Sequence, residues 1–151
     1  MPIYRDDWVK LLTSDGKTFT VSPYILRHSI TIYARMESAY ERGQTLKQPI
    51  PLKKCTAEVF RQILIFIQYH RFDSVLSDRK EYEDTRLSSW DKEFMKNNEG
   101  IAGDLIVAAT ELEIHRLYAV ICKAAVGFFE AARNRNVQRS MSIENAPIAE
   151  E

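Results

Sequence analysis

Cysteine is scarce in this sequence, and neither of the two cysteines belongs to a recognisable motif. Cys55 and Cys122 form no CxxC pair and have no histidine at ligand spacing, which argues against a zinc site. Isolated cysteines of this kind are typical of reduced thiols in the cytosol or nucleus. We therefore expect a protein of the cytoplasm and nucleus that needs neither a disulfide nor a metal.

Net charge and long apolar runs are also missing. The chain carries 21 basic and 21 acidic side chains, so no whole-molecule charge favours nucleic acid or an anionic membrane. The longest clean apolar runs, "ILIFI" and "LIVAA", are far too short to span a bilayer. The first residues, "MPIYRDDW", lack the layout of a secretion signal. Neither a nucleic acid nor a membrane is an expected partner.

Catalytic motifs are absent from the sequence as well. No GxSxG elbow occurs, and the segment "GIAG" lacks both the lysine and the preceding strand of a phosphate-binding loop. Cys122 falls in the middle of a predicted helix on a mostly apolar face, where a thiol usually packs as a small hydrophobic group. We expect no enzymatic activity, no catalytic residue and no cofactor.

The segment "ELEIH" brings two acids and a histidine together. On a helix, Glu111 and His115 would lie one turn apart, a spacing that could hold a divalent metal. However, the histidines form no HExxH or His-x-His motif. Leu112 ends one apolar helical stripe and Ile114 begins the next. The segment is therefore interpreted as a junction between two helices.

The first half of the chain predicts a hairpin followed by helices. Val9 and Leu11 alternate with Lys10, an Asp-Gly turn follows, and the alternation then resumes, which is typical of two antiparallel strands. Two short helices are expected, one over residues 22–28 and one from Ser29 or Thr31 to Tyr40, then a polar loop and a brief extended piece. A broad apolar stripe after Thr56 predicts the central core helix. Its members are Val59, Phe60, Ile63, Leu64, Ile65, Phe66 and Ile67.

The second half predicts an exposed loop and then only helices. Residues 71–89 are charged and poorly periodic, which indicates a solvent-exposed connection. Ser89 is the expected cap of the next helix, two further helices meet near residue 113, and Asn134 is expected to cap a last separate helix. The predicted fold class is therefore α+β.

Apolar residues gather near the C-terminus with no later segment in the sequence to cover them. They are Val126, Phe128, Phe129, Val137, Met141 and Ile143. Two interpretations remain open from the residues alone. The cluster packs back onto its own domain, or it forms a surface that a partner completes.

Four colinear segments resemble one known family. They are "VKLLTSDGKTFTVSPYILRHSITI", "IPLKKCTAEVFRQILIFIQYH", "SSWDKEFMKNNEGIAGDLIVAATELEIHRLYAVICKAAVGFF" and "NVQRSMSI". Together they resemble the S-phase kinase-associated (Skp) adaptor family of SCF ubiquitin ligases over about residues 8–146. Elongin C, a relative with the same BTB/POZ fold, shares the hairpin turn and the "PL" strand.

The resemblance implies a BTB/POZ fold and a particular division of the chain. Residues 8–70 would form its N-terminal part and residues 71–89 an exposed loop. Residues 90–129 would supply its C-terminal helices. Residues 130–151 would form an F-box-binding extension of the dimerisation type, which is truncated relative to the family.

The resemblance also implies partners. The family bridges an F-box substrate receptor to a cullin for ubiquitin-dependent degradation, and BTB/POZ relatives often form homodimers. By resemblance, Thr110 and Glu111 would contact the cullin. The residues that would contact the F-box are Cys122, Val126, Phe129, Val137, Met141 and Ile143.

Departures from the family pattern lead to a second hypothesis. Family members commonly carry Asn-Tyr where this chain has Thr110 and Glu111, and the usual tail continues into another acidic helix. Losing an aromatic anchor at an interface costs roughly 2–4 kcal/mol. The alternative is therefore a diverged Skp-like protein that binds F-box or other partners but recruits a cullin weakly or not at all.

Overall fold

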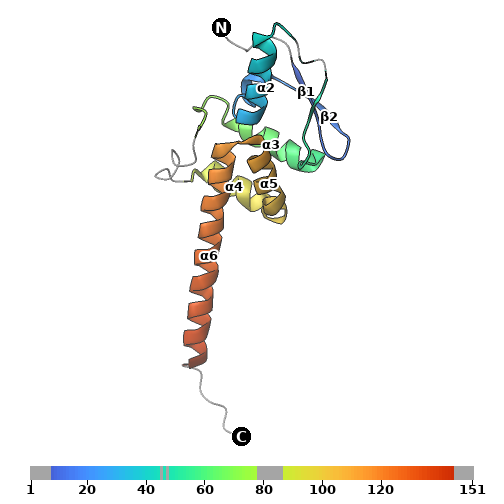
Figure 1. The fold of residues 1–151 in the computed structure, drawn as a ribbon. Helices are drawn as coiled ribbons and strands as arrows, with labels where there is room; N and C mark the ends of the chain where they lie inside the picture. Colours follow the sequence, from blue (N-terminus) through green and yellow to red (C-terminus); the bar gives the residue numbers. More distant parts are fainter. Residues whose placement is uncertain (1–7, 45, 47, 78–86, 145–151) are drawn as a thin grey trace.

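A computed structural model describes residues 8–44, 46, 48–77 and 87–144 of the chain (Figure 1). Within the last helix, the side chains of residues 128, 129, 131 and 139–144 are outside this description. The elements in order are β1 (Val9–Leu12), β2 (Thr18–Val21), α1 (Pro23–Leu26), α2 (Ile30–Glu41), β3 (Ile50–Pro51), α3 (Ala57–Tyr69), α4 (Ser89–Asn97), the 3-10 turn η2 (Glu99–Ile101), α5 (Ala102–Leu112) and α6 (His115–Glu144).

The predicted hairpin is confirmed. Strands β1 and β2 pair antiparallel, with Val9 opposite Val21, and Gly16 takes the positive φ of 84° that the turn requires. Asp15 accepts hydrogen bonds from the Thr13 hydroxyl at 2.6 Å and from the first N–H of α3 at 3.0 Å. These bonds, led by the one from Thr13, hold the pKa of Asp15 below its usual range. The hairpin turn is thereby fastened to the core helix.

A three-stranded sheet is completed by β3, which pairs parallel with β1 in the order β2-β1-β3. Helices α1 and α2 form the crossover that a parallel pair needs. Helix α1 begins as predicted, with the Ser22 hydroxyl accepting a backbone N–H of the first turn. Of the two predicted starts of α2, Ser29 is the cap, because its hydroxyl accepts the Ile32 N–H. Figure 1 shows the sheet to one side of the helices.

The core forms around α3. Thr56 caps this helix, and the fully buried side chains include Phe60, Ile63 and Ile67. Phe19 of β2 meets Phe60 edge to face at 5.1 Å, which joins the sheet to the helix. Ile65 was expected to widen the buried stripe, but it is 48% exposed. That expectation is wrong because Ile65 falls on a side of α3 that none of the other described elements covers.

The loop between α3 and α4 is less exposed than its charge predicts. Phe72 and Asp73 face solvent, but Leu76 is buried. His70 anchors this region, since its Nδ1 lies 2.6 Å from an Asp73 oxygen and its Nε2 lies 2.8 Å from an oxygen of buried Asp91. Residues 78–86 of the predicted loop lie outside the described part of the chain.

Two predicted helix starts are wrong. The N-cap of α4 is Ser88 and not Ser89, because the Ser88 hydroxyl accepts the Asp91 N–H at 3.1 Å. Asn134 does not begin a separate helix, because α6 runs without a break from His115 to Glu144. No proline or glycine follows Gly127 within α6, so nothing in the local sequence ends the helix there.

Candidate partner-binding site

Residues 112–115 make a tight connection between α5 and α6. Glu113 adopts a left-handed conformation with a φ of 50°, in a position where helices commonly end on glycine. The Ile114 N–H donates to the Ala109 carbonyl at 3.0 Å and closes the turn. The interpretation of "ELEIH" as a helix junction is confirmed.

The first residues of α2 hold the end of α5. The Ser29 hydroxyl donates to the Leu112 carbonyl at 2.5 Å. The Thr31 hydroxyl donates to the Glu111 carbonyl at 3.1 Å. These carbonyls belong to the last turn of α5 and have no partner within their own helix. The junction is therefore a fixed edge of the molecule and not a loose loop.

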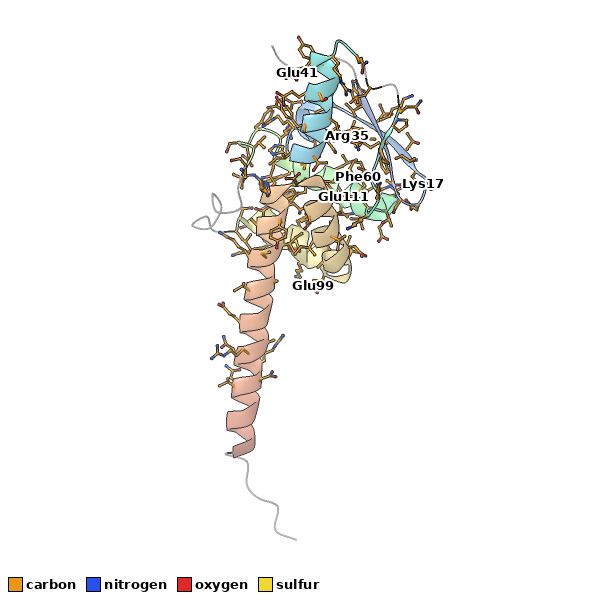
Figure 2. The ribbon with its side chains drawn as sticks, in the orientation of Figure 1. Lys17, Arg35, Glu41, Phe60, Glu99 and Glu111 are labelled. Atoms are coloured by element: carbon orange, nitrogen blue, oxygen red, sulfur yellow. The ribbon has the colours of Figure 1, made fainter. Side chains whose placement is uncertain are left out.

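The two residues of the predicted cullin contact behave differently on this edge. Thr110 is exposed, and its hydroxyl donates to the Ile106 carbonyl at 2.8 Å. Glu111 is half-buried in the body of the molecule (Figure 2), where one carboxylate oxygen accepts the Lys54 N–H at 2.9 Å. Its other oxygen is buried and makes no hydrogen bond with the described atoms. Thr110 thus faces solvent, while Glu111 supports the loop before α3.

Glu111 also influences the nearest cysteine. Burial raises the pKa of Cys55 to about 12, and the negative charges of Glu111 and Asp15 act in the same direction. Cys55 is therefore a protonated thiol at neutral pH, which is a poor nucleophile. Both cysteines are free in the structure, and Cys122 is half-buried on α6.

The acids of the junction have separate partners. While Glu111 accepts from Lys54, Glu113 accepts the Thr31 hydroxyl at 3.0 Å. Among the described residues, no group of three or more histidines, cysteines or acids is placed to hold a metal ion. In the structure, the acids of the junction accept hydrogen bonds that hold neighbouring segments in place.

The second candidate surface lies on α6, which projects far beyond the other elements (Figure 1). Residues 133–138 are all exposed. Val126 is 56% exposed and Val137 is 50% exposed. They are three helical turns apart and share one side of α6 with Cys122. Phe129, Met141 and Ile143 also lie within α6, but the structure describes only their backbone and not their side chains.

The exposed valines settle part of the question that the sequence left open. Val126 and Val137 do not pack back onto the described part of the domain, although an apolar side chain gains by leaving water. Val126 and Val137, the two members of the predicted cluster whose side chains are described, are therefore open to solvent. None of the described helices is both long enough and apolar enough to cross a membrane.

Comparison with known proteins identifies the relatives of this chain. The family model for the tetramerisation domain of the Skp1 family matches residues 7–72. A "Skp1-related protein" of Caenorhabditis elegans is 30% identical over 149 residues, covering 95% of this chain and 84% of that protein. The chain belongs to the Skp1 family.

Further Skp1 family relatives also match along most of the chain. The "Suppressor of kinetochore protein 1" of Schizosaccharomyces pombe is 26% identical, over 95% of this chain and 89% of that protein. The "E3 ubiquitin ligase complex SCF subunit sconC" of Arthroderma benhamiae is 23% identical, over 95% of this chain and 87% of that protein. Membership of the Skp1 family confirms the predicted resemblance and the α+β BTB/POZ fold.

Sequence analysis did not identify the residues that support the α5–α6 junction. Ser29 and Thr31 had been noticed only as helix starts, although their hydroxyls also hold α5. Lys54 carried no signal, because its contact with Glu111 uses the backbone N–H and joins residues 57 positions apart. Such a contact follows from the tertiary packing and not from any local pattern.

Proposed function

We propose that this chain is an adaptor subunit of an SCF E3 ubiquitin ligase, which bridges an F-box substrate receptor to a cullin. The observation that carries the proposal is colinear similarity across 95% of the chain to a relative named as an SCF subunit. The adaptor acts by holding two partners close together. It has no catalytic residue, cofactor or metal of its own.

The two partner surfaces would lie at separate places on the fold. The exposed face of α6, represented by Val126 and Val137, would receive the F-box. The edge formed by Thr110 and the α5–α6 junction would receive the cullin. Because the junction is braced by α2 and the Lys54 loop, both partners would be held in a defined relation.

The proposal also covers the free chain and its place in the cell. Without an F-box, the exposed valines of α6 would favour a homodimer, which light scattering measures directly. The two free thiols are typical of proteins in the cytoplasm and nucleus, and we propose that location for this chain. Fluorescence microscopy of a fusion to a fluorescent protein would test it.

A pull-down with a purified cullin N-terminal domain tests the adaptor proposal. We expect the wild-type chain, bound to an F-box protein, to retain the cullin. The double variant Thr110→Asn/Glu111→Tyr should bind more tightly, because an aromatic side chain adds buried area where a carboxylate must be desolvated. A wild-type chain that retains no cullin while the double variant retains it would establish the diverged alternative.

Two controls keep this test specific to the interface. Glu111→Gln keeps an oxygen that accepts the Lys54 N–H but removes the charge, so it separates electrostatic effects from support of the loop. Circular dichroism must show an unchanged helix content in every variant. If neither wild type nor variant binds the cullin while both bind an F-box, the adaptor proposal is overturned.

A further inference from the structure

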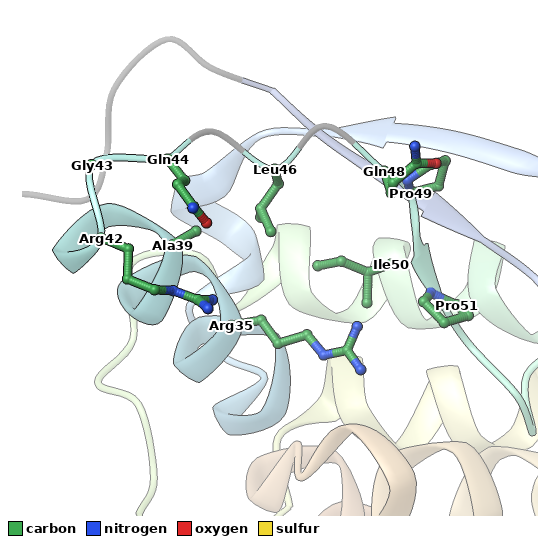
Figure 3. Close-up of a pocket in the computed structure, with 10 residues that line it drawn as sticks. All are labelled: Arg35, Ala39, Arg42, Gly43, Gln44, Leu46, Gln48, Pro49, Ile50 and Pro51. Carbon is green, nitrogen blue, oxygen red and sulfur yellow. The ribbon is translucent and has the colours of Figure 1, made fainter.

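A groove runs along α2 opposite Leu46 and residues 48–51 (Figure 3). Its volume is about 680 Å³, and its lining includes Arg35, Arg42, Leu46, Pro49 and Pro51. A second hollow of about 380 Å³ shares Arg35, Arg42 and Leu46 and extends the lining to Ala34 and Ser38. The two hollows therefore meet at the same pair of arginines.

The arginines of this groove have no acidic partner among the described residues. No described carboxylate forms an ion pair with either guanidinium, and the ion pairs found in that part of the chain involve only His70. Arg42 donates from Nε to the Ser38 carbonyl within its own helix at 3.2 Å. Both arginines are exposed. The groove thus offers two guanidinium groups for a bound anion.

The spacing of the arginines favours an elongated ligand. Arg35 lies on α2, and Arg42 is the C-cap of the same helix seven positions later. Their Cα atoms are therefore separated by about 10.5 Å along the helix axis. Figure 3 shows both side chains reaching from α2 toward the groove. A guanidinium binds a carboxylate with two parallel hydrogen bonds. Two carboxylates on one extended segment can reach both positions.

The remainder of the lining is largely apolar. Leu46 is 37% exposed, and on the side opposite the arginines Pro51 is exposed and Pro49 is half-buried. Ile50 belongs to this side but is only 4% exposed, so the accessible apolar surface comes from Leu46 and the two prolines. A free phosphate ion would leave this apolar surface unused. An aliphatic side chain placed between two acids would cover it and gain free energy from its burial.

The edge of β3 limits how such a segment binds. Proline has no backbone N–H, so among residues 49–51 only Ile50 retains a donor. A strand edge with so few donors is a poor template for an added strand. Recognition would therefore depend on the arginines and the apolar side chains.

We propose that the groove formed by Arg35, Arg42, Leu46 and Pro51 binds an acidic, aliphatic segment of a partner protein. Carboxylates of that segment lie on the two arginines, and an aliphatic side chain lies against Leu46 and Pro51. The site is on α2 and β3, which carry none of the residues predicted to contact an F-box or a cullin. It gives the adaptor a third binding surface.

Selection from a phage-displayed library of random 12-residue peptides tests this proposal with the full-length chain. The selected peptides should be rich in Asp or Glu next to Leu, Ile or Val. As fluorescent synthetic peptides, they should bind the variant Arg35→Gln/Arg42→Gln at least tenfold more weakly than wild type. Leu46→Ser should weaken them severalfold, and binding should fall as salt rises because exposed ion pairs are screened.

The matched control is Arg133→Gln/Arg135→Gln, which removes two exposed positive charges from α6 and should leave peptide affinity unchanged. The proposal is overturned if no peptide is selected, or if the selected peptides bind wild type and the α2 variant equally. A titration with inorganic phosphate distinguishes a peptide-binding groove from a simple anion site. If phosphate alone shifts the amide resonances of residues 34–51 and Leu46→Ser changes no affinity, the groove is an anion site and not a peptide site.

Discussion

His28 is buried between α1 and α2, and its environment opposes a positive charge. Burial is the main reason that its pKa falls from 6.5 to about 4, and the nearby charges of Arg27, Arg116 and His70 lower it further. Its Nε2 is buried and makes no hydrogen bond with the described atoms. The folded protein therefore keeps this side chain neutral at pH values where the unfolded chain takes up a proton.

This difference predicts a loss of stability in mild acid. The contribution of neutral His28 is complete above pH 6.5 and is lost as the pH falls from 6.5 toward 4. Between pH 7.5 and pH 5, wild type should lose about 2 kcal/mol of unfolding free energy that His28→Gln does not lose. Urea denaturation of both proteins at the two pH values measures this.

Parallel pH dependence of wild type and His28→Gln would contradict the prediction. Should the variant fail to fold, the wild-type protein still provides a test. An NMR titration of the His28 ring protons must then give a pKa near 4.

At the scale of elements, helix ends in this protein are decided by single hydroxyls. Ser88 accepts the Asp91 N–H and donates to the Asp91 carboxylate at 2.9 Å. Asp91 is 1% exposed and also faces His70. Ser88 thus begins α4 and satisfies a buried carboxylate that connects α4 to the end of α3. Its neighbour Ser89 is exposed and lies within the first turn of the helix.

The paired variants Ser88→Ala and Ser89→Ala should therefore differ. Loss of the cap and of one bond to buried Asp91 should cost roughly 1–2 kcal/mol in Ser88→Ala. Ser89→Ala should change the unfolding free energy by less than about 0.5 kcal/mol. Urea denaturation at pH 7 measures both values. Equal effects of the two substitutions would show that the cap is not at Ser88.

At the scale of the whole molecule, the protein consists of a packed body and one projecting helix. In the body, the sheet packs against α3, and α5 packs against α3 and α6. Beyond Ala124, which is buried, α6 continues into a run of exposed residues. An isolated helix has little stability in water, because most helical stability in proteins comes from packing. We therefore expect the outer part of α6 to be protected from amide exchange only when a partner covers it.

Amide hydrogen exchange should reveal this dependence. In the free chain, residues 133–144 should exchange far faster than α3 and α5, and binding of an F-box should slow them by at least tenfold. In Val126→Glu/Val137→Glu, the F-box should bind at least tenfold more weakly and the protection should disappear. Both valines are exposed, so the folded body should remain intact. Slow exchange throughout α6 in the free chain would contradict the prediction.

Features set by neighbouring residues were correctly predicted from the sequence. The Asp-Gly turn, the caps at Ser22 and Thr56, and the helix junction near Glu113 all follow from bonds that span a few positions. For α2 the sequence left Ser29 and Thr31 as alternative starts, and the structure places the cap at Ser29. The apolar stripe of the core helix was also predicted from the sequence. Because the stripe is wide, the sequence did not reveal that the side carrying Ile65 remains exposed. Two adjacent serines before Trp90 could not be distinguished, because either hydroxyl can cap a helix.

The sequence alone determined the fold class, the family and the local starts and turns, since alternation and helical spacing are written into consecutive residues. Tertiary structure decided the rest. The parallel pairing of β3 with β1, the support of α5 by Ser29 and Thr31, and the contact of Glu111 with Lys54 join residues far apart in the chain. These contacts exist because burial of the apolar faces of the helices brings their polar ends together. A pattern in consecutive residues cannot predict which helix ends will contact each other.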